Sequence, residues 1–168
     1  MNLRRVISLA ALAVFMFGAE AAKSTHAQTT VKHVQSTASP IATAVWAGDT
    51  LYVSGQIASP VTPADPAKGT PAVYGDTKAQ ATSEILKIQA ILKEQGLTLG
   101  DVVMMHVYLA GDPAKDGKLD FAGLQAAYTQ YFGTTDQPNK PARAAMQVAA
   151  LAAPWALVEI EVIAVRSK

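Results

Sequence analysis

The sequence predicts one α+β domain in which two helices cover one face of a mixed β-sheet. Two β-rich runs flank a Gly-Asp turn, two stretches repeat apolar residues at helical spacing, and alternating apolar runs close the chain. The expected order is therefore β-β-β-α-β-α-β-β. With 168 residues, 50% of them hydrophobic and 16% charged, the chain is long and apolar enough to form a core.

The first half of the mature chain supplies three of the strands and one helix. Residues 31–35 predict a short strand, and residues 42–46 and 50–54 predict a hairpin around residues 47–49. Gly55 follows at once, which predicts a bulge or a close approach to the backbone. After a Pro- and Gly-rich loop over residues 58–75, Asp76 should cap a helix that stops at Gly96. Its apolar stripe is Ala81, Ile85, Ile88 and Leu92, and its charged residues, Lys78, Glu84, Lys87, Lys93 and Glu94, are expected on the solvent side.

The next strand, over residues 101–109, has two largely apolar faces. One should hold Val103, Met105, Val107 and Leu109, and the other Met104, His106 and Tyr108. Such a strand is covered on both sides, or on one side by a partner subunit. Asp120 should then cap a second helix with the stripe Leu124, Ala127, Tyr128 and Tyr131, ending at Gly133.

The last two strands carry charges within apolar sequence. Arg143 lies at the start of one, and Val158, Ile160, Val162 and Ala164 of the other should face the helices. Glu159 and Glu161 then share the opposite face with Leu157, Ile163 and Val165, a mixture that suits a subunit interface containing a pocket. Because a guanidinium can hold a carboxylate at two points, we expect a small-acid site at Arg143. The alternative is structural: an interface ion pair of Arg143 with Glu159 or Glu161. Glu161 and His106 are expected to be structural.

The N-terminus has the pattern of a secretory signal. Arg4 and Arg5 precede an uncharged apolar run over residues 6–17, and small-residue sites follow at residues 19–21 and 25–27. We therefore expect a signal peptide at residues 1–27, one domain at residues 28–168, and a periplasmic or secreted protein that leaves the membrane after cleavage. A core helix and an uncleaved anchor are the alternatives.

Composition excludes several kinds of site. The chain has no cysteine, and His26, His33 and His106 lack metal-ligand spacing, so neither a thiolate nor a metal site is expected. Residues 1–27 hold three of the 14 basic and one of the 13 acidic residues, so the rest carries a net charge of −1. This balance provides no basic footprint for nucleic acid and disfavours a ribonuclease.

Several motifs together resemble the RidA family (YjgF/YER057c/UK114). They are Val53-Ser54-Gly55-Gln56-Ile57, the strand over residues 102–109, the helix region from Phe121 to Phe132, Pro141-Ala142-Arg143, and the Glu-Ile-Glu strand over residues 158–165. The resemblance covers residues 31–166. It implies a chorismate-mutase-like α+β subunit, a homotrimer with clefts between subunits, and hydrolysis of small 2-imino acids to 2-keto acids and ammonia without metal or organic cofactor.

The resemblance also assigns site residues. Arg143 corresponds to the arginine that grips the substrate carboxylate, and Glu159 to the glutamate that positions the attacking water. Gly55 and Gln56 correspond to the region near the cleft. Ile41 replaces a family tyrosine, and Gln125 takes the place of a family asparagine, which implies a more apolar pocket. The alternative function is a non-enzymatic, trimeric small-ligand-binding or chaperone-like exported protein.

Overall fold

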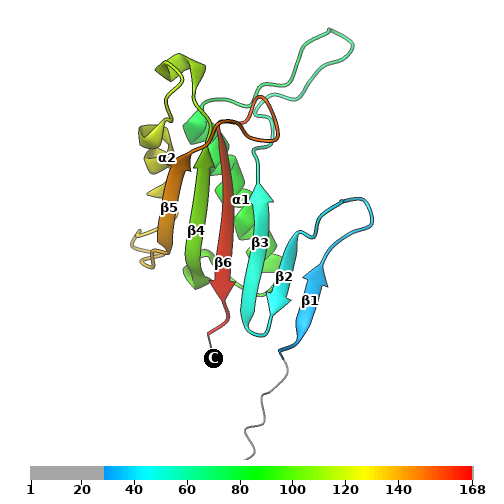
Figure 1. The fold of residues 1–168 in the computed structure, drawn as a ribbon, viewed down its shortest axis with the longest axis vertical. Coiled ribbons are helices and arrows are strands. Elements are labelled where there is room, and N and C mark those ends of the chain that lie inside the picture. The colour runs from blue at the N-terminus through cyan, green and yellow to red at the C-terminus, as the bar shows by residue number, and fades with distance from the viewer. Residues whose placement is uncertain (1–28, 168) are drawn as a thin grey trace, which may run out of the picture.

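A six-stranded mixed sheet with two helices on one face makes up the described part of the protein, as a computed structural model shows (Figure 1). The structure describes residues 29–167, so the predicted signal peptide lies outside the described residues. None of the helices in residues 29–167 has the length and apolar character needed to cross a membrane.

The elements follow the predicted order. The strands are β1 Val31–Val34, β2 Ala44–Ala47, β3 Thr50–Gln56, β4 Val102–Leu109, β5 Ala142–Gln147 and β6 Val158–Val165; the helices are α1 Thr77–Glu94 and α2 Phe121–Tyr128, with 3-10 turns at Leu99–Asp101 and Pro113–Lys115. The sheet order is β1-β2-β3-β6-β4-β5, with β4 and β5 parallel and the other neighbours antiparallel. The last strand thus lies in the middle of the sheet, and the predicted α+β fold class is confirmed.

Both helices begin at the predicted caps. The side chain of Asp76 accepts a hydrogen bond from the Ala79 amide at 2.9 Å, and that of Asp120 accepts one from the Gly123 amide at 3.0 Å. These bonds satisfy amides that have no partner inside the helix. Gly96 follows α1 with a φ of 73°, a conformation that glycine adopts without steric strain.

The core lies between the helices and the inner face of the sheet. On β6, Val158, Ile160, Val162 and Ala164 are at most 1% exposed, as the alternation predicted. On β4 the prediction fails at one position, because the register with β6 shifts between Val102 and Met104. Val102 is therefore buried, whereas Val103, expected on the same face as the buried Met105, is 48% exposed.

Glu84 is a second correction. It was expected on the solvent side of α1, but its exposure is 0%. Thr77, Gln80 and Glu84 recur at helical spacing on the buried face of α1, together with Ala81 and Ile85. The helix therefore buries a polar row beside its apolar stripe, and the position of Glu84 in the helical repeat, rather than its charge, decides its burial.

Two long connections leave the sheet. Residues 58–75 form a narrow ribbon held by the bridges Thr62↔Val73 and Asp65↔Thr70, and this ribbon projects beyond the end of β3 (Figure 1). At its base, Tyr74 stacks on Trp155 with ring centroids 3.4 Å apart. The connection between β1 and β2 also projects from the sheet (Figure 1).

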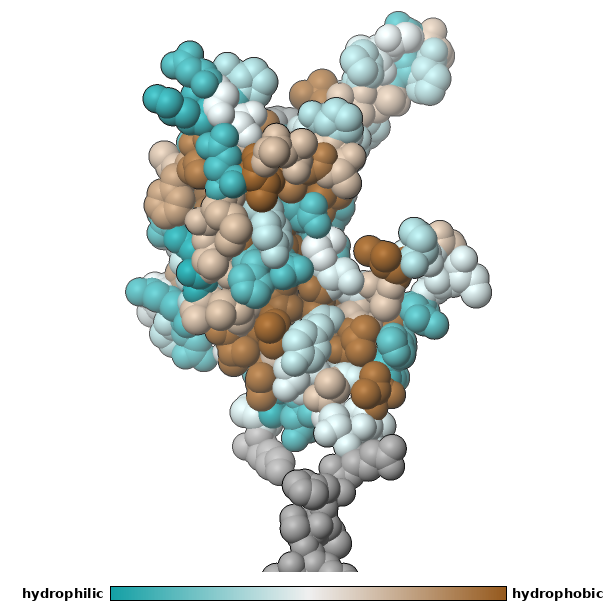
Figure 2. Space-filling model, in the orientation of Figure 1, coloured by the Kyte–Doolittle hydropathy of each residue, from teal (hydrophilic) through white to brown (hydrophobic). Residues whose placement is uncertain are grey.

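The face of the sheet away from the helices is open in the single subunit. It carries residues on four neighbouring strands, Tyr52, Met104, His106, Tyr108, Met146, Glu159, Glu161 and Ile163. Tyr52 and Met146 are 48% and 45% exposed. Figure 2 shows hydrophobic and hydrophilic side chains side by side on this face. This is the mixed face that the alternation of β6 predicted.

Candidate active site

The predicted site residues fall into two clusters. The arginine cluster consists of Arg143 on β5 with Phe121, Gln125 and Tyr128 on α2. The glutamate cluster consists of Glu159 on β6 with Gly55 and Gln56 at the end of β3. The structure thus brings Arg143 to Gln125 and Glu159 to Gly55, as separate pairs.

In the arginine cluster the guanidinium is fixed on one side. Arg143 Nη2 donates a hydrogen bond to Gln125 Oε1 at 2.9 Å. The guanidinium carbon lies 4.4 Å from the Tyr128 ring centroid and 5.7 Å from that of Phe121, within the range of cation–π contacts. Phe121, Gln125 and Tyr128 are four and three residues apart, so they lie along one face of α2.

The other side of the guanidinium is unsatisfied. Arg143 Nη1 is buried and has no hydrogen-bond partner among the described residues. None of the ion pairs between described residues includes Arg143. Burial raises the pKa of Tyr128, with the Arg143 cation opposing the rise, so its hydroxyl stays protonated beside the guanidinium. A buried donor on a half-buried cation calls for an anionic acceptor.

In the glutamate cluster the carboxylate of Glu159 lies directly against the backbone of Gly55, which has no side chain. A Cβ at residue 55 would overlap Glu159 Oε1, so glycine leaves room for the Glu159 carboxylate in this position. The register of β3 with β6 shifts between Val53 and Gln56, which confirms the irregularity predicted at Gly55. Burial, and next the negative charge of Glu161, raise the pKa of Glu159, which makes it a better base than an exposed carboxylate.

Glu161 belongs to a polar group of its own on the open face. Its Oε1 lies 2.9 Å from His106 Nδ1 and accepts a hydrogen bond from the Tyr108 hydroxyl at 3.2 Å. Burial and the charge of Glu161 raise the pKa of Tyr108. These contacts link Glu161 on β6 to His106 and Tyr108 on β4 across the open face.

The two clusters lie on opposite faces of one subunit's sheet. Arg143 is opposite Met105 of β4, whose 0% exposure shows that this position faces the helices. Glu159 is opposite Tyr108, on the open face. Since paired residues point to the same face and residues 105 and 108 point to different faces, Arg143 and Glu159 diverge within one subunit.

The remaining predicted site residues are placed as follows. Gln56 Nε2 donates to the carbonyl oxygens of Ser54 and Gly55 at 2.9 and 3.2 Å, so its amide folds back onto the irregular end of β3. Ile41 is 62% exposed on the projecting β1–β2 connection, where Ser39 Oγ donates to its carbonyl oxygen at 2.7 Å. Ile41 therefore does not contribute to the core of its own subunit.

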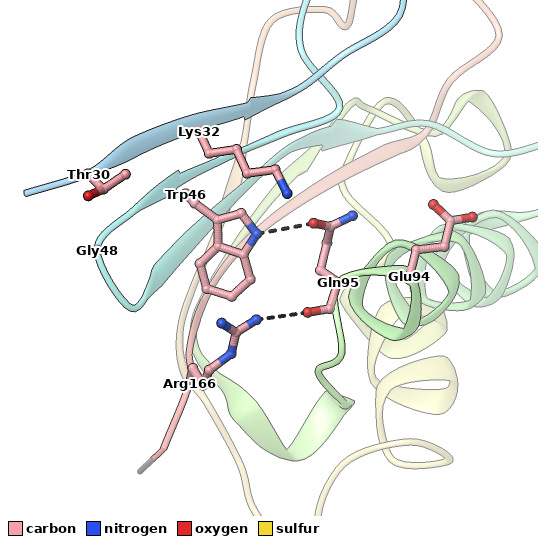
Figure 3. A pocket seen from close by; sticks show the side chains of 7 residues that line it. All are labelled: Thr30, Lys32, Trp46, Gly48, Glu94, Gln95 and Arg166. Carbon is pink, nitrogen blue, oxygen red and sulfur yellow. Dashed lines mark hydrogen bonds between the residues drawn. The ribbon is translucent and has the colours of Figure 1, made fainter.

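A pocket at the far end of the molecule has a structural explanation. It has a volume of about 340 Å³ and lies between β1, β2 and the C-terminal end of α1 (Figure 3). Trp46 Nε1 donates to Gln95 Oε1 at 3.1 Å, and Arg166 Nη2 donates to the Gln95 carbonyl oxygen at 3.0 Å (Figure 3). The Arg166 guanidinium also lies 4.3 Å from the Trp46 ring centroid. A cation at the end of a helix is favourable, so these contacts fasten the C-terminus to α1.

Among residues 29–167, no group of three or more His, Cys, Asp or Glu side chains is arranged to hold a metal ion. The donors at the candidate site are a guanidinium, an amide and carboxylates. Such a set can bind a small carboxylate and activate a water by a carboxylate base.

Comparison with known proteins identifies the family. The family model described as Endoribonuclease L-PSP matches residues 30–166. The chain belongs to the RidA (YjgF/YER057c/UK114) family. The RidA resemblance of the sequence motifs is thereby confirmed.

Named relatives of this RidA-family chain include a RutC family protein from Pyrococcus abyssi, 41% identical over 125 residues, which cover 74% of this chain and 85% of the relative. The 2-iminobutanoate/2-iminopropanoate deaminase of Salmonella typhimurium is 38% identical over 119 residues, 71% of this chain and 81% of that protein. Among solved structures, E. coli TdcF with bound serine matches with a TM-score of 0.61 at 30% identity, covering 81% of this chain and 99% of TdcF.

Three features of the site were missed in the sequence. The spacing of Phe121 and Tyr128 from Gln125 could have placed all three on one helix face. The polar group around Glu161 could have been found from strand register, which the sequence alone does not give. The burial of Glu84 was missed because its charge outweighed its position in the helical repeat.

Proposed function

We propose that this RidA-family protein hydrolyses small 2-imino acids to 2-keto acids and ammonia, at clefts where subunits of a homotrimer meet. The observation that carries the proposal is the unsatisfied guanidinium of Arg143. Its Nη2 is held by Gln125 and its face by Tyr128, while the buried Nη1 has no partner. A carboxylate on the substrate would accept from that donor in a charge-assisted hydrogen bond.

Glu159 supplies the base in this proposal. Its raised pKa, caused mainly by burial, favours taking a proton from the attacking water. Glu159 takes a proton from the water that adds to the imine carbon and passes this proton to the nitrogen, which gives the carbinolamine. The proton of the carbinolamine hydroxyl is then transferred to the nitrogen by way of Glu159 as the C–N bond breaks, leaving ammonia and the keto acid. Free imines hydrolyse unaided, so positioning by Arg143 and one base supply the modest acceleration required.

The divergence of the two clusters supports a site between subunits. Arg143 faces the helix side and Glu159 the open side of the same sheet. A site that uses both groups is therefore best assembled from Arg143 of one subunit and Glu159, with Gly55, of its neighbour. The exposed Ile41 and the apolar residues of the open face provide the surface for such a contact.

The relatives support the choice of reaction. The Salmonella relative is named an imine deaminase, and the TdcF structure contains serine, a small amino acid with a carboxylate. An iminopropanoate substrate has the same three-carbon length and the same carboxylate.

The test is to generate iminopropanoate with an amino-acid oxidase and follow its decay with and without the mature protein. Arg143→Ala should reduce kcat/KM by roughly 100-fold, since charge-assisted hydrogen bonds contribute about 1.5–3 kcal/mol each. Arg143→Lys keeps the charge but loses the fork, and should lose most of the activity. Arg166→Lys is the matched control, because Arg166 also stacks on an aromatic ring and donates one hydrogen bond, but at the remote pocket.

Equal acceleration by the wild type and Arg143→Ala would refute the role of Arg143. If the wild type does not accelerate decay, yet still binds small carboxylates in an Arg143-dependent manner, the non-enzymatic ligand-binding function replaces the enzyme.

A further inference from the structure

The carboxyl group of Glu84, buried on the helix side of the sheet, has no role in the proposed mechanism. Glu84 lies on the face of α1 that packs on the sheet, is 0% exposed, and neither of its carboxyl oxygens has a hydrogen-bond partner among the described residues. A carboxyl group in such a place is unfavourable, and an apolar side chain of similar size would pack there more stably. Packing alone therefore does not explain a glutamate at this position.

The surroundings of Glu84 keep it neutral. Lys87, on the next turn of α1, donates to the Ile57 carbonyl oxygen at 2.7 Å, and none of the ion pairs between described residues includes Glu84. Burial, and next the negative charge of Glu159, raise the pKa of Glu84 from 4.5 to about 10. Lys87 and the Ala58 amide, which lies near the carboxyl group without completing a hydrogen bond, lower this pKa but do not offset the rise. The carboxyl group thus keeps its proton at neutral pH.

Glu84 and Glu159 lie on opposite sides of the same strand end. On the helix side of the sheet, two hydrogen bonds hold residues 57–59 against α1. Lys87 Nζ donates to the Ile57 carbonyl oxygen, and the Ser59 amide donates to Ser83 Oγ at 3.0 Å. On the open face, the Glu159 carboxylate lies against Gly55 in the space that a Cβ at residue 55 would fill. The missing side chain at residue 55 therefore brings Glu159 close to the backbone that separates it from Glu84.

We propose that Glu84 is a positioning residue for Glu159, and that the two carboxyl groups share a single negative charge across the end of β3, which resides on Glu159. Glu84 holds its proton throughout, so Glu159 is the anion and serves as the base. The catalytic consequence rests on the proposed function: the proton that Glu159 takes from water passes to the departing nitrogen, and the proton on Glu84 is not consumed.

The arrangement makes the site sensitive to alkaline pH. The charged groups that act on Glu84 are Glu159 from β6 and Lys87 from its own helix, whereas the segment after β3 contributes only the Ala58 amide. When Glu84 loses its proton, a second negative charge appears beside Glu159. That charge repels a substrate that itself carries a carboxylate, so turnover should fall as Glu84 ionises.

The charge sharing can be tested without substrate, because the chain has only five glutamates, Glu20, Glu84, Glu94, Glu159 and Glu161. Glutamate labelled with ¹³C at the side-chain carboxyl is incorporated, and the NMR signals are followed from acid to alkaline pH. Glu84→Gln identifies the Glu84 signal, which should titrate only at alkaline pH. Glu159→Gln should lower its midpoint by roughly one pH unit, because a like charge is removed.

Glu161→Gln is the matched control. Glu161 is on the same strand and face as Glu159 and acts on Glu159, but it is not among the groups that act on Glu84. The midpoint of the Glu84 signal should therefore stay in place in this variant. An ionised Glu84 at neutral pH, or a midpoint that Glu159→Gln leaves unmoved, overturns the inference.

The pH profile of imine hydrolysis tests the catalytic consequence. The wild type should lose kcat/KM as Glu84 ionises, whereas Glu84→Gln should keep it. One pH unit above the Glu84 midpoint, the ratio of the variant to the wild type should have risen by about tenfold. If kcat/KM falls in the same way at alkaline pH in the wild type and in Glu84→Gln, Glu84 is not a positioning residue. If no form of the protein hydrolyses imines while the NMR coupling is present, the proposed function fails and the shared charge stands.

Discussion

Replacing Glu84 by glutamine should change how the stability of the protein depends on pH. Glutamine keeps the size of the side chain and removes its ionisation. In the folded protein the pKa of Glu84 is about 10, above its ordinary value of 4.5. The stability contributed by the protonated group is therefore fully present below about pH 4.5 and is lost as the pH rises towards 10, because only the unfolded chain releases the proton.

The size of the effect follows from proton linkage. Between these two pKa values, unfolding releases close to one proton from Glu84, and the free energy of unfolding falls by about 1.4 kcal/mol per pH unit. From pH 5 to pH 8 the wild type should thus lose about 4 kcal/mol relative to Glu84→Gln. This difference is a large part of the stability of an ordinary domain.

The assay is urea unfolding of both proteins at several pH values and one protein concentration, because the stability of an oligomer depends on concentration. Glu94→Gln is the control, since Glu94 is exposed near the end of the same helix. The free energy of unfolding of Glu94→Gln should change with pH as that of the wild type does. If the curve of Glu84→Gln also runs parallel to that of the wild type between pH 5 and 8, Glu84 is not held protonated by burial.

Three further outcomes are expected. Gly55→Ala places a Cβ where Glu159 Oε1 lies, so it should displace the proposed base and reduce turnover more than ligand affinity, with little loss of stability because the displaced atoms end a flexible side chain; unchanged kinetics would show that this carboxylate position is not needed. Light scattering should give about three times the subunit mass, and Ile163→Lys, which charges the open face, should shift the protein towards monomers; a stable wild-type monomer would remove the site between subunits. In a fractionated host, N-terminal sequencing should show that about 21–27 residues have been removed from exported protein, whereas an intact Met1 on cytoplasmic protein would contradict the signal peptide.

Periodicity predicted most of the fold. The α1 stripe with Ile85 and Ile88, the caps Asp76 and Asp120, and the alternation of β6 each depend on local spacing, which the sequence shows directly. The prediction failed at Val103, where a register shift moves one residue to the other face. A bulge depends on how two distant strands meet, so local alternation does not reveal it.

The candidate site was predictable in its residues but not in its arrangement. The motifs pointed to Arg143, Gln125, Glu159 and Gly55, and the structure pairs the first two and the last two. Their separation onto two faces follows from the parallel pairing of β5 with β4, which places Arg143 opposite Met105. Strand pairing between segments about 40 residues apart is a tertiary property, and spacing along the chain does not encode it.

The opposite orientation of Arg143 and Glu159 has a consequence for genetics. Suppose that every cleft takes its arginine from one subunit and its glutamate from the next. A trimer made only of Arg143→Ala subunits, or only of Glu159→Gln subunits, then has no complete cleft. In a ring that mixes Arg143→Ala with Glu159→Gln subunits, one boundary always joins an intact arginine to an intact glutamate. Two inactive alleles expressed together would then complement each other, whereas two alleles that damage the same cluster would not.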